Sequence, residues 1–355
     1  MKEPPVLFVT NHVPPARVPA FAALHERENV VFALFGGRAR HAGVEGPPPA
    51  ELPFPHRRIR QAGVARLAGS GGFRAVVAGS VGRLALPGAY AGARRARIPF
   101  VLWTALWAQP RTVAGLAGAP LLRRLYRDAD AVATYGPHVS AYVRARGARH
   151  VFVAPQAVDN DFWSAAAGRP RPAAYTVLFI GRLDREKGVS VLLDAWRLAG
   201  LDEHAALVLV GRGPERARAA ATRTTHVAGP QPPEEVRNFY AAADVVVLPS
   251  IPTRGFREPW GLVVNEAMNQ GVAIIATDAV GAAAGGLVRH EHNGLVVPAA
   301  DAGALARAIV RLRHEPELRA ALGAAAREDV RAYTPAAWAE GIHAALAAAS
   351  DVREG

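Results

Sequence analysis

The chain has 355 residues, and half of them are hydrophobic. A chain of this length is too long for a single hydrophobic core of ordinary size, so we expect two domains. It contains no cysteine, so disulfides, thiolate metal sites and cysteine nucleophiles are excluded. The first residues lack the apolar run of a signal peptide, and no apolar stretch reaches the roughly 18 to 20 residues that span a bilayer, so we expect a cytoplasmic protein.

The net charge of +12 comes entirely from the first half of the chain. Residues 1–165 hold 21 Lys and Arg against 9 Asp and Glu, whereas residues 166–355 hold 21 of each. Such a basic half is typical of a surface that attracts phosphates, anionic lipid or nucleic acid. A solvated surface in an Arg-rich protein explains the same count.

Short apolar runs without alternation recur through both halves and predict strands of parallel sheets that are covered on both faces. In the first half these runs span residues 6–10, 30–35, 75–79, 100–103, 131–134 and 151–155. In the second half they span residues 176–181, 206–211, 226–229, 245–250, 272–277 and 295–298. The predicted fold class is α/β, with two Rossmann-like, doubly wound domains facing each other across a cleft.

The domain boundaries follow from breaks in this pattern. The Gly- and Pro-rich stretch 162–172 is typical of a linker, so we expect domains at residues 1–165 and 166–333. Tyr333-Thr334-Pro335 breaks the Ala-rich helices that follow the last strand, and residues 336–349 predict a final helix inside a terminal segment, 334–355.

Three motifs in loops have structural explanations that we favour. Gly211-Arg212-Gly213 begins a dinucleotide fingerprint, but Arg216 replaces the third glycine, so we expect a tight turn. Asp128-Ala129-Asp130 and Asp159-Asn160-Asp161 have the spacing of cation ligands, yet their positions favour capping or turn roles. No histidine pair has metal-ligand spacing, so we expect neither a metal site nor a cofactor.

The segment 250–271 carries the most chemistry. It follows a predicted strand and predicts a short helix from about Leu262, whose exposed N–H groups attract phosphate. Glu258 lies in the loop before this helix, and Glu266 lies about one turn inside it, roughly 6 Å further along the axis. Carboxylates accept hydrogen bonds from hydroxyl groups, so a sugar and a ribose fit the two glutamates.

Counter-charge for a diphosphate is available in the loop that begins at Gly181. Arg182 and Lys187 are the candidates. The chain has only one other lysine, Lys2, beside 40 arginines, so composition alone does not explain an ammonium group at 187. The alternative is a surface residue that enters a helix.

Three motifs of the second half resemble those of the retaining glycosyltransferases of family 4, which have the GT-B fold. They are G-R-L-D-R-E-K-G at 181–188, E-P-W-G-L-V-V-N-E at 258–266 and N-G-L-V-V-P at 293–298. The resemblance covers about residues 151–350. It implies a metal-independent hexosyltransferase that moves a sugar from a UDP- or GDP-sugar to an acceptor hydroxyl, in the synthesis of cell-envelope glycans, glycolipids or natural-product glycosides.

The resemblance also implies roles for individual residues. Arg182 and Lys187 would neutralise the donor diphosphate, Glu266 would bind the ribose, and Glu258 would contact the transferred sugar. Family members send their last helix back to the first domain. The donor-binding residues implied in this way are Gly181, Arg182, Lys187, Glu258, Gly261, Leu262, Val263 and Glu266.

The acceptor side departs from the family pattern. Many relatives carry a histidine after the fourth strand of the first domain, where this chain has W-T-A-L-W-A-Q at 103–109. We therefore take Trp103 and His12, which lies in the first loop, as acceptor-side candidates. The basic first domain suggests peripheral contact with an anionic membrane surface or with a lipid-linked acceptor, and a soluble acceptor is the alternative.

Two other functions fit parts of the sequence. A nucleotide-sugar 2-epimerase has the same two-domain plan but fits the region of Glu266 less well. A nucleic-acid-binding protein would explain the basic half, but the sequence contains no recognisable binding module, so we expect no nucleic-acid partner.

Overall fold

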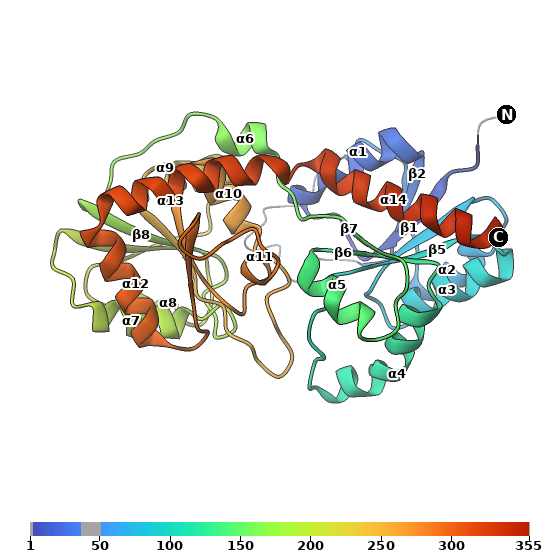
Figure 1. Cartoon of the computed structure of the whole chain (residues 1–355), viewed down its shortest axis with the longest axis horizontal. Helices are drawn as coiled ribbons and strands as arrows, with labels where there is room; N and C mark the ends of the chain where they lie inside the picture. The colour runs from blue at the N-terminus through green and yellow to red at the C-terminus, as the bar shows by residue number, and fades with distance from the viewer. Residues whose placement is uncertain (1–2, 37–50, 355) are drawn as a thin grey trace. The chain divides into compact units, whose positions relative to one another are not determined.

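The computed structural model describes residues 3–36 and 51–354. The chain forms two compact units, one made of residues 1–157 with 333–355 and the other of residues 158–332. Each unit is a parallel sheet with helices packed against it (Figure 1). The predicted fold class, two Rossmann-like α/β domains, is therefore confirmed.

The first unit is built on a seven-stranded sheet with the strand order β3-β2-β1-β4-β5-β6-β7. Every residue of the interior strand β1 is buried, as expected for a strand with helices on both faces. The strands are β1 (Val6–Thr10), β2 (Val30–Leu34), β3 (His56–Arg58), β4 (Ala75–Gly79), β5 (Phe100–Thr104), β6 (Ala131–Thr134) and β7 (Val151–Val153).

Helices cover both faces of this sheet. One face packs against α1 and α14, whose Phe21 and Trp338 are buried among the strand side chains. The other face packs against α2, α3 and α5. The helices of this unit are α1 (Val18–Glu28), α2 (Val64–Ala68), α3 (Ala85–Ala96), α4 (Val113–Asp128), α5 (Pro137–Arg144) and α14 (Pro335–Glu354), with short 3-10 helices η1 (Pro15–Arg17) and η2 (Gln61–Gly63).

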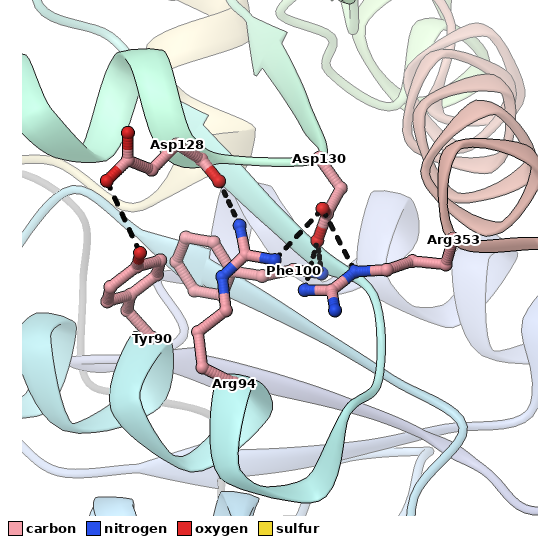
Figure 2. A network of polar contacts seen from close by, with 6 residues as sticks. All are labelled: Tyr90, Arg94, Phe100, Asp128, Asp130 and Arg353. Atoms are coloured by element: carbon pink, nitrogen blue, oxygen red, sulfur yellow. Dashed lines mark hydrogen bonds and ion pairs between the residues drawn. The ribbon is translucent and has the colours of Figure 1, made fainter. Parts of the chain in front are cut away.

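The last helix, α14, returns to the first unit and lies along α1 (Figure 1). It extends beyond the predicted range 336–349 at its C-terminal end. Near that end, Arg353 donates to the carboxylate of Asp130 from Nε and Nη2, at 3.1 and 3.2 Å. Asp130 also accepts from Arg94 at 3.1 Å and from the backbone N–H of Phe100 at 2.8 Å (Figure 2).

This network explains the first of the two D-x-D motifs. Asp130 is buried, and burial raises the pKa of its carboxyl group against the opposing effects of the Phe100 hydrogen bond and the Arg94 charge. Asp128, at the end of α4, pairs with Arg124 and Arg127. The motif thus joins α3, β5 and α14, which is a structural role.

The second unit has a six-stranded sheet with the order β10-β9-β8-β11-β12-β13. Its strands are β8 (Tyr175–Ile180), β9 (Ala205–Val210), β10 (Thr225–Gly229), β11 (Val245–Leu248), β12 (Ala273–Thr277) and β13 (Gly294–Val297). Its helices are α6 (Asn160–Ser164), α7 (Val189–Ala199), α8 (Arg216–Ala220), α9 (Pro233–Ala241), α10 (Val263–Asn269), α11 (Gly281–Ala284), α12 (Ala302–His314) and α13 (Pro316–Asp329), followed by η3 (Val330–Ala332). The apolar sides of α7 and α12 pack together on one face of the sheet.

The division between the units falls at residues 157 and 158, before the predicted linker. The reason is α6, which packs against the second unit. Gln270 donates from its side-chain amide to the carbonyl oxygens of Trp163 and Ala165, the latter at 3.0 Å. The buried ring of Trp163 also lies edge-on to Tyr240, with 5.8 Å between the ring centroids.

Candidate functional site

Three loops meet at the carboxyl edge of the second sheet, which is where doubly wound folds bind ligands. The loop after β8 contacts the loop after β11 through a hydrogen bond from the backbone N–H of Ile251 to the carbonyl oxygen of Glu186, 3.1 Å long. The loop after β11 is fixed in turn to the loop after β12, because the N–H of Gly281 donates to the carbonyl oxygen of Glu258 at 3.1 Å. These contacts bring the candidates from distant parts of the sequence together.

Glu258 and Lys187 form the centre of this site. The Nζ atom of Lys187 lies 2.5 Å from Oε2 of Glu258, and the side chains are 23% and 7% exposed. Ser250, at the end of β11, donates from its hydroxyl to the same oxygen at 2.9 Å. A buried ion pair of this kind is costly to break, because removing one partner leaves a charge away from water. The pair therefore holds Glu258 in a defined position.

Arg182 lies in the same loop as Lys187. Its guanidinium pairs with Asp184 at 2.5 Å and with Glu186. Burial lowers the pKa of Arg182, but the hydrogen bond that it donates to Glu186 and the charges of Asp184, Glu186 and Glu258 outweigh burial, and the net shift is upward. Arg182 thus carries a permanent charge close to Glu258.

Glu266 lies on α10 and is positioned by a residue that the sequence analysis does not identify. The hydroxyl of Tyr240, from α9, donates to Oε2 of Glu266 at 2.7 Å. Burial, followed by the nearby Glu266, raises the pKa of Tyr240 well above its usual range, so the phenol keeps its proton. No motif in the sequence marks Tyr240, because its contact with Glu266 depends on how α9 packs against α10.

The helix that carries Glu266 is short, as predicted, and begins at Val263, next to the predicted start at about Leu262. α10 has seven residues, and its first turn has no side-chain cap at Leu262. The backbone turns into it at Gly261, where φ is +94°. Within the described part of the chain, the amides of Gly261 and Leu262 donate no backbone hydrogen bond, so they are available to an anion.

The remaining loop motifs of the second unit are structural. The carboxylate of Asp159 caps α6 by accepting from the N–H of Phe162 at 3.1 Å. The turn at 211–213 is tied to the loop after β8, since the carbonyl oxygen of Arg212 accepts from the N–H of Leu183 at 2.8 Å. Among residues 3–36 and 51–354, no group of three or more His, Asp or Glu could hold a metal ion.

The acceptor-side candidates of the first unit lie near the carboxyl edge of its sheet. Trp103 is only 8% exposed and packs against Phe8, Phe21, Trp338 and Tyr135. His12 follows β1 and is half-buried. Arg17, which no sequence motif marks, is buried beside Trp103.

Residues 165–329 match the family described as Glycosyl transferases group 1. The chain is 38% identical over 191 residues to a phosphatidyl-myo-inositol mannosyltransferase of Mycobacterium leprae, a match that covers 50% of this chain and 48% of that protein. It is 32% identical over 238 residues to a D-inositol 3-phosphate glycosyltransferase of Saccharomonospora viridis, covering 61% of this chain and 50% of the relative. The chain thus spans about half the length of these relatives.

Solved structures match over nearly the whole chain. HepE of Anabaena in complex with UDP-glucose superposes with a TM-score of 0.73 at 19% identity and covers 96% of this chain and 99% of that one. Sucrose-phosphate synthase from Thermosynechococcus elongatus gives a TM-score of 0.72 at 22% identity, covering 96% and 98%. The chain has the GT-B fold of these structures, and its residues 165–329 match the family Glycosyl transferases group 1.

Proposed function

We propose that this chain is a retaining glycosyltransferase that moves a hexose-type sugar from a UDP- or GDP-sugar to an acceptor hydroxyl. The observation that carries the proposal is the cluster at the carboxyl edge of the second sheet. There Lys187 and Arg182 lie beside the buried carboxylate of Glu258, and the amides at the start of α10 are open. Two cations beside free amides suit a diphosphate, and fixed carboxylates suit the hydroxyl groups of a sugar and a ribose.

In this proposal the paired cations serve the donor without leaving their carboxylates. An ammonium group has three N–H donors and a guanidinium has five, so Lys187 and Arg182 retain donors for phosphate oxygens while they hold Glu258, Asp184 and Glu186. Glu258 then contacts the transferred sugar, and Tyr240 holds Glu266 toward the ribose. Gly181, Gly261, Leu262 and Val263 supply backbone around the diphosphate.

Transfer of the sugar requires that the protein position the donor and the acceptor and stabilise the charge that develops on the leaving group. As the glycosidic bond to the diphosphate breaks, negative charge develops on the leaving phosphate, and Arg182, Lys187 and the amides of α10 stabilise it. The acceptor hydroxyl attacks from the same face and gives its proton to the leaving phosphate, which retains the configuration. The cations of the protein supply the charge, so the proposed reaction needs no metal ion.

The acceptor is proposed to be anionic and to belong to envelope glycan or glycolipid synthesis, with a soluble natural product as the alternative. The names of two relatives support this, since one acts on phosphatidyl-myo-inositol and the other on D-inositol 3-phosphate. We place the protein in the cytoplasm, with peripheral contact to the inner face of the plasma membrane. No helix in the described ranges is long and apolar enough to span a bilayer.

The surface that supports membrane contact lies on α4, between Val113 and Leu121. Val113, Leu116 and Leu121 are 87%, 57% and 44% exposed, which is unusual for apolar residues so close in sequence. Exposed arginines flank them at 111, 123, 124 and 127. Exposed apolar residues with exposed basic residues near them on one helix are typical of a segment that lies in a membrane interface.

Calorimetric titration with UDP, GDP and ADP in EDTA tests the donor site. We expect one nucleotide to bind, and Lys187→Ala and Glu266→Ala each to weaken that binding at least tenfold. Glu203→Ala, which removes a carboxylate of the same unit that is 73% exposed, should bind like the parent. Lys187→Ala leaves Glu258 without the ammonium group that it pairs with, which can destabilise the fold. The melting temperature of each variant is therefore measured to establish that it is folded.

Two results would contradict the proposal. Absence of binding in EDTA for all three nucleotides would refute a metal-independent donor site. If the matching nucleotide sugar is instead returned with an altered sugar and no glycoside forms, the chain is an epimerase.

A further inference from the structure

Arg17 occupies an unusual position in the first unit. It ends η1, the short 3-10 helix after β1, and is 7% exposed. Its guanidinium carbon lies 5.4 Å from the ring centroid of Trp103 and 5.2 Å from that of Tyr135. Trp103 belongs to β5 and Tyr135 follows β6, so the three side chains gather at the carboxyl edge of the sheet.

The guanidinium of Arg17 has aromatic neighbours, and no carboxylate among residues 3–36 and 51–354 pairs with it. No hydrogen bond or ion pair joins it to a described residue, and its Nη1 atom is buried without a partner. Other arginines of this unit are more exposed and nevertheless paired: Arg74, 22% exposed, binds Glu28, and Arg94, 30% exposed, binds Asp130. Arg17 is thus the more buried cation and lacks the carboxylate that the others have.

Such an arrangement is energetically unfavourable on its own. Arginine stays protonated in proteins, and a buried charge is normally paired and hydrogen-bonded. Stacking on two aromatic rings offsets only part of this cost. The indole Nε1 of Trp103 is also buried without an acceptor. The guanidinium of Arg17 therefore lies over the indole ring of Trp103, and neither Nη1 of the one nor Nε1 of the other has an acceptor among the described residues.

We propose that Arg17 and the indole N–H of Trp103 bind a compact anionic group, a phosphate or a carboxylate, on the acceptor. A guanidinium binds either group with two parallel hydrogen bonds. The anion would enter past Tyr135, which is the most exposed of the three side chains. The assignment of this anion to the acceptor rests on the proposed glycosyltransferase function, whereas the anion site itself is built from residues of the first unit alone.

Nuclear magnetic resonance of the six tryptophan side-chain N–H groups tests this site. The Trp103 signal is assigned as the one that disappears in Trp103→Phe. We expect it to shift saturably when inorganic phosphate or, in a separate titration, acetate is added to the full chain. The anion with the tighter response identifies the preferred group. In Arg17→Met the shift should be lost, or the apparent affinity should fall at least tenfold.

Two controls separate this site from other anion effects. Arg66→Met removes an exposed arginine of the same unit and should leave the response unchanged. Lys187→Ala should also leave it unchanged, although it weakens any phosphate binding at the donor cluster. A Trp103 signal that neither anion moves, or that moves equally in Arg17→Met, would overturn the proposal.

Thermal unfolding without added anions gives a second readout. If Arg17 is part of an anion site that is empty under these conditions, Arg17→Met removes an uncompensated buried charge. The variant should then unfold at the same temperature as the parent or at a higher one. If the arginine only stacks on the two rings, the variant should be less stable. Nucleotide titration of the same variant shows independently whether the donor site is intact, so failure of this inference can be told from failure of the proposed function.

Discussion

Gly188 shows how one residue sets the geometry of the donor cluster. Its φ is +71°, and a Cβ atom at this position would lie 1.8 Å from the carbonyl oxygen of Pro249. The loop that carries Arg182 and Lys187 can therefore approach the loop of Glu258 only because residue 188 has no side chain.

We predict that Gly188→Ala destabilises the protein by about 2 to 4 kcal/mol, because both backbone strain and a backbone collision oppose it. Gly200→Ala is the matched control. Its φ is +58°, but a Cβ atom there meets nothing within 4 Å, so only strain of about 1 kcal/mol applies. Urea unfolding measures both variants, and equal losses of stability would contradict the role assigned to the contact with Pro249.

Tyr240 gives a prediction about binding. Tyr240→Phe keeps the fully buried ring but removes the hydroxyl that donates to Glu266. Loss of one hydrogen bond to a charged group should weaken nucleotide binding by about 3- to 10-fold, or roughly 1 kcal/mol, since Glu266 is no longer held in one orientation.

Tyr175→Phe is the control for that measurement. Its hydroxyl is equally buried in the same unit but donates to the carbonyl oxygen of Ile309, at 2.8 Å. We expect this variant to lose stability and to retain the nucleotide affinity of the parent. If Tyr240→Phe also retains that affinity in calorimetry, Glu266 does not depend on Tyr240.

Among the secondary-structure elements, the sequence predicts those that have a local pattern of apolar residues. All twelve predicted strands are present, because buried strands of parallel sheets are apolar along their whole length. β3 is missed, since its three residues, His-Arg-Arg, are exposed and the strand lies at the edge of the sheet, where it has no apolar run to reveal it.

Contacts between distant elements could not be predicted from the sequence. The motifs place Glu258, Arg182 and Lys187 in loops after strands and Glu266 in the helix that follows one of these loops. The topology then brings these segments together. The partners Tyr240 and Ser250 depend on side-chain packing and on no motif. The observed boundary between the units differs from the predicted one for the same reason. α6 packs against the end of α10, and this tertiary contact cannot be read from the composition of the linker.

The N-G motif at 293–294 connects two elements, β13 and α13, through Asp329. Asn293 is fully buried and donates to the carbonyl oxygen of Leu287 at 2.8 Å and to Asp329 at 2.7 Å. Arg289 contacts the same carboxylate at 2.6 Å. Burial acts to raise the pKa of Asp329, but the hydrogen bonds from Arg289 and Asn293 and the nearby charges outweigh it, and the pKa is lowered.

This lowered pKa predicts a pH dependence. Because the pKa of Asp329 is lower in the folded than in the unfolded state, its contribution to stability is complete above its ordinary value of 3.8 and is lost as the pH falls through the folded-state value. The difference in unfolding free energy between the parent and Asp329→Asn should therefore shrink below about pH 4. Asp351→Asn, which alters an exposed aspartate, should follow the parent, and a difference for Asp329→Asn that stays constant from pH 6 to pH 3 would contradict the role of its ionised form.

At the scale of the whole molecule, the charge is divided unevenly: the first half carries the entire excess of 12 positive charges and the second half is neutral. The exposed apolar face of α4 lies within the basic half. An apolar face and basic residues reinforce one another at an anionic membrane, where each Lys or Arg near the surface contributes about 1 kcal/mol. The distribution therefore predicts that the first unit, and not the second, makes the membrane contact.

We predict that the protein sediments with vesicles containing phosphatidylglycerol and does so weakly with vesicles of phosphatidylcholine alone. Leu116→Glu should reduce the bound fraction several-fold, because it places an anion in the apolar face of α4 beside the lipid phosphates. Leu198→Glu is the matched control, since Leu198 is 66% exposed on α7 of the second unit and should not affect binding. Raising the salt concentration should weaken binding, as screening of the arginines requires.

If Leu116→Glu binds like the parent while salt still releases the protein, the contact is electrostatic only and α4 does not insert. If both leucine variants lose binding equally, the contact does not belong to the first unit.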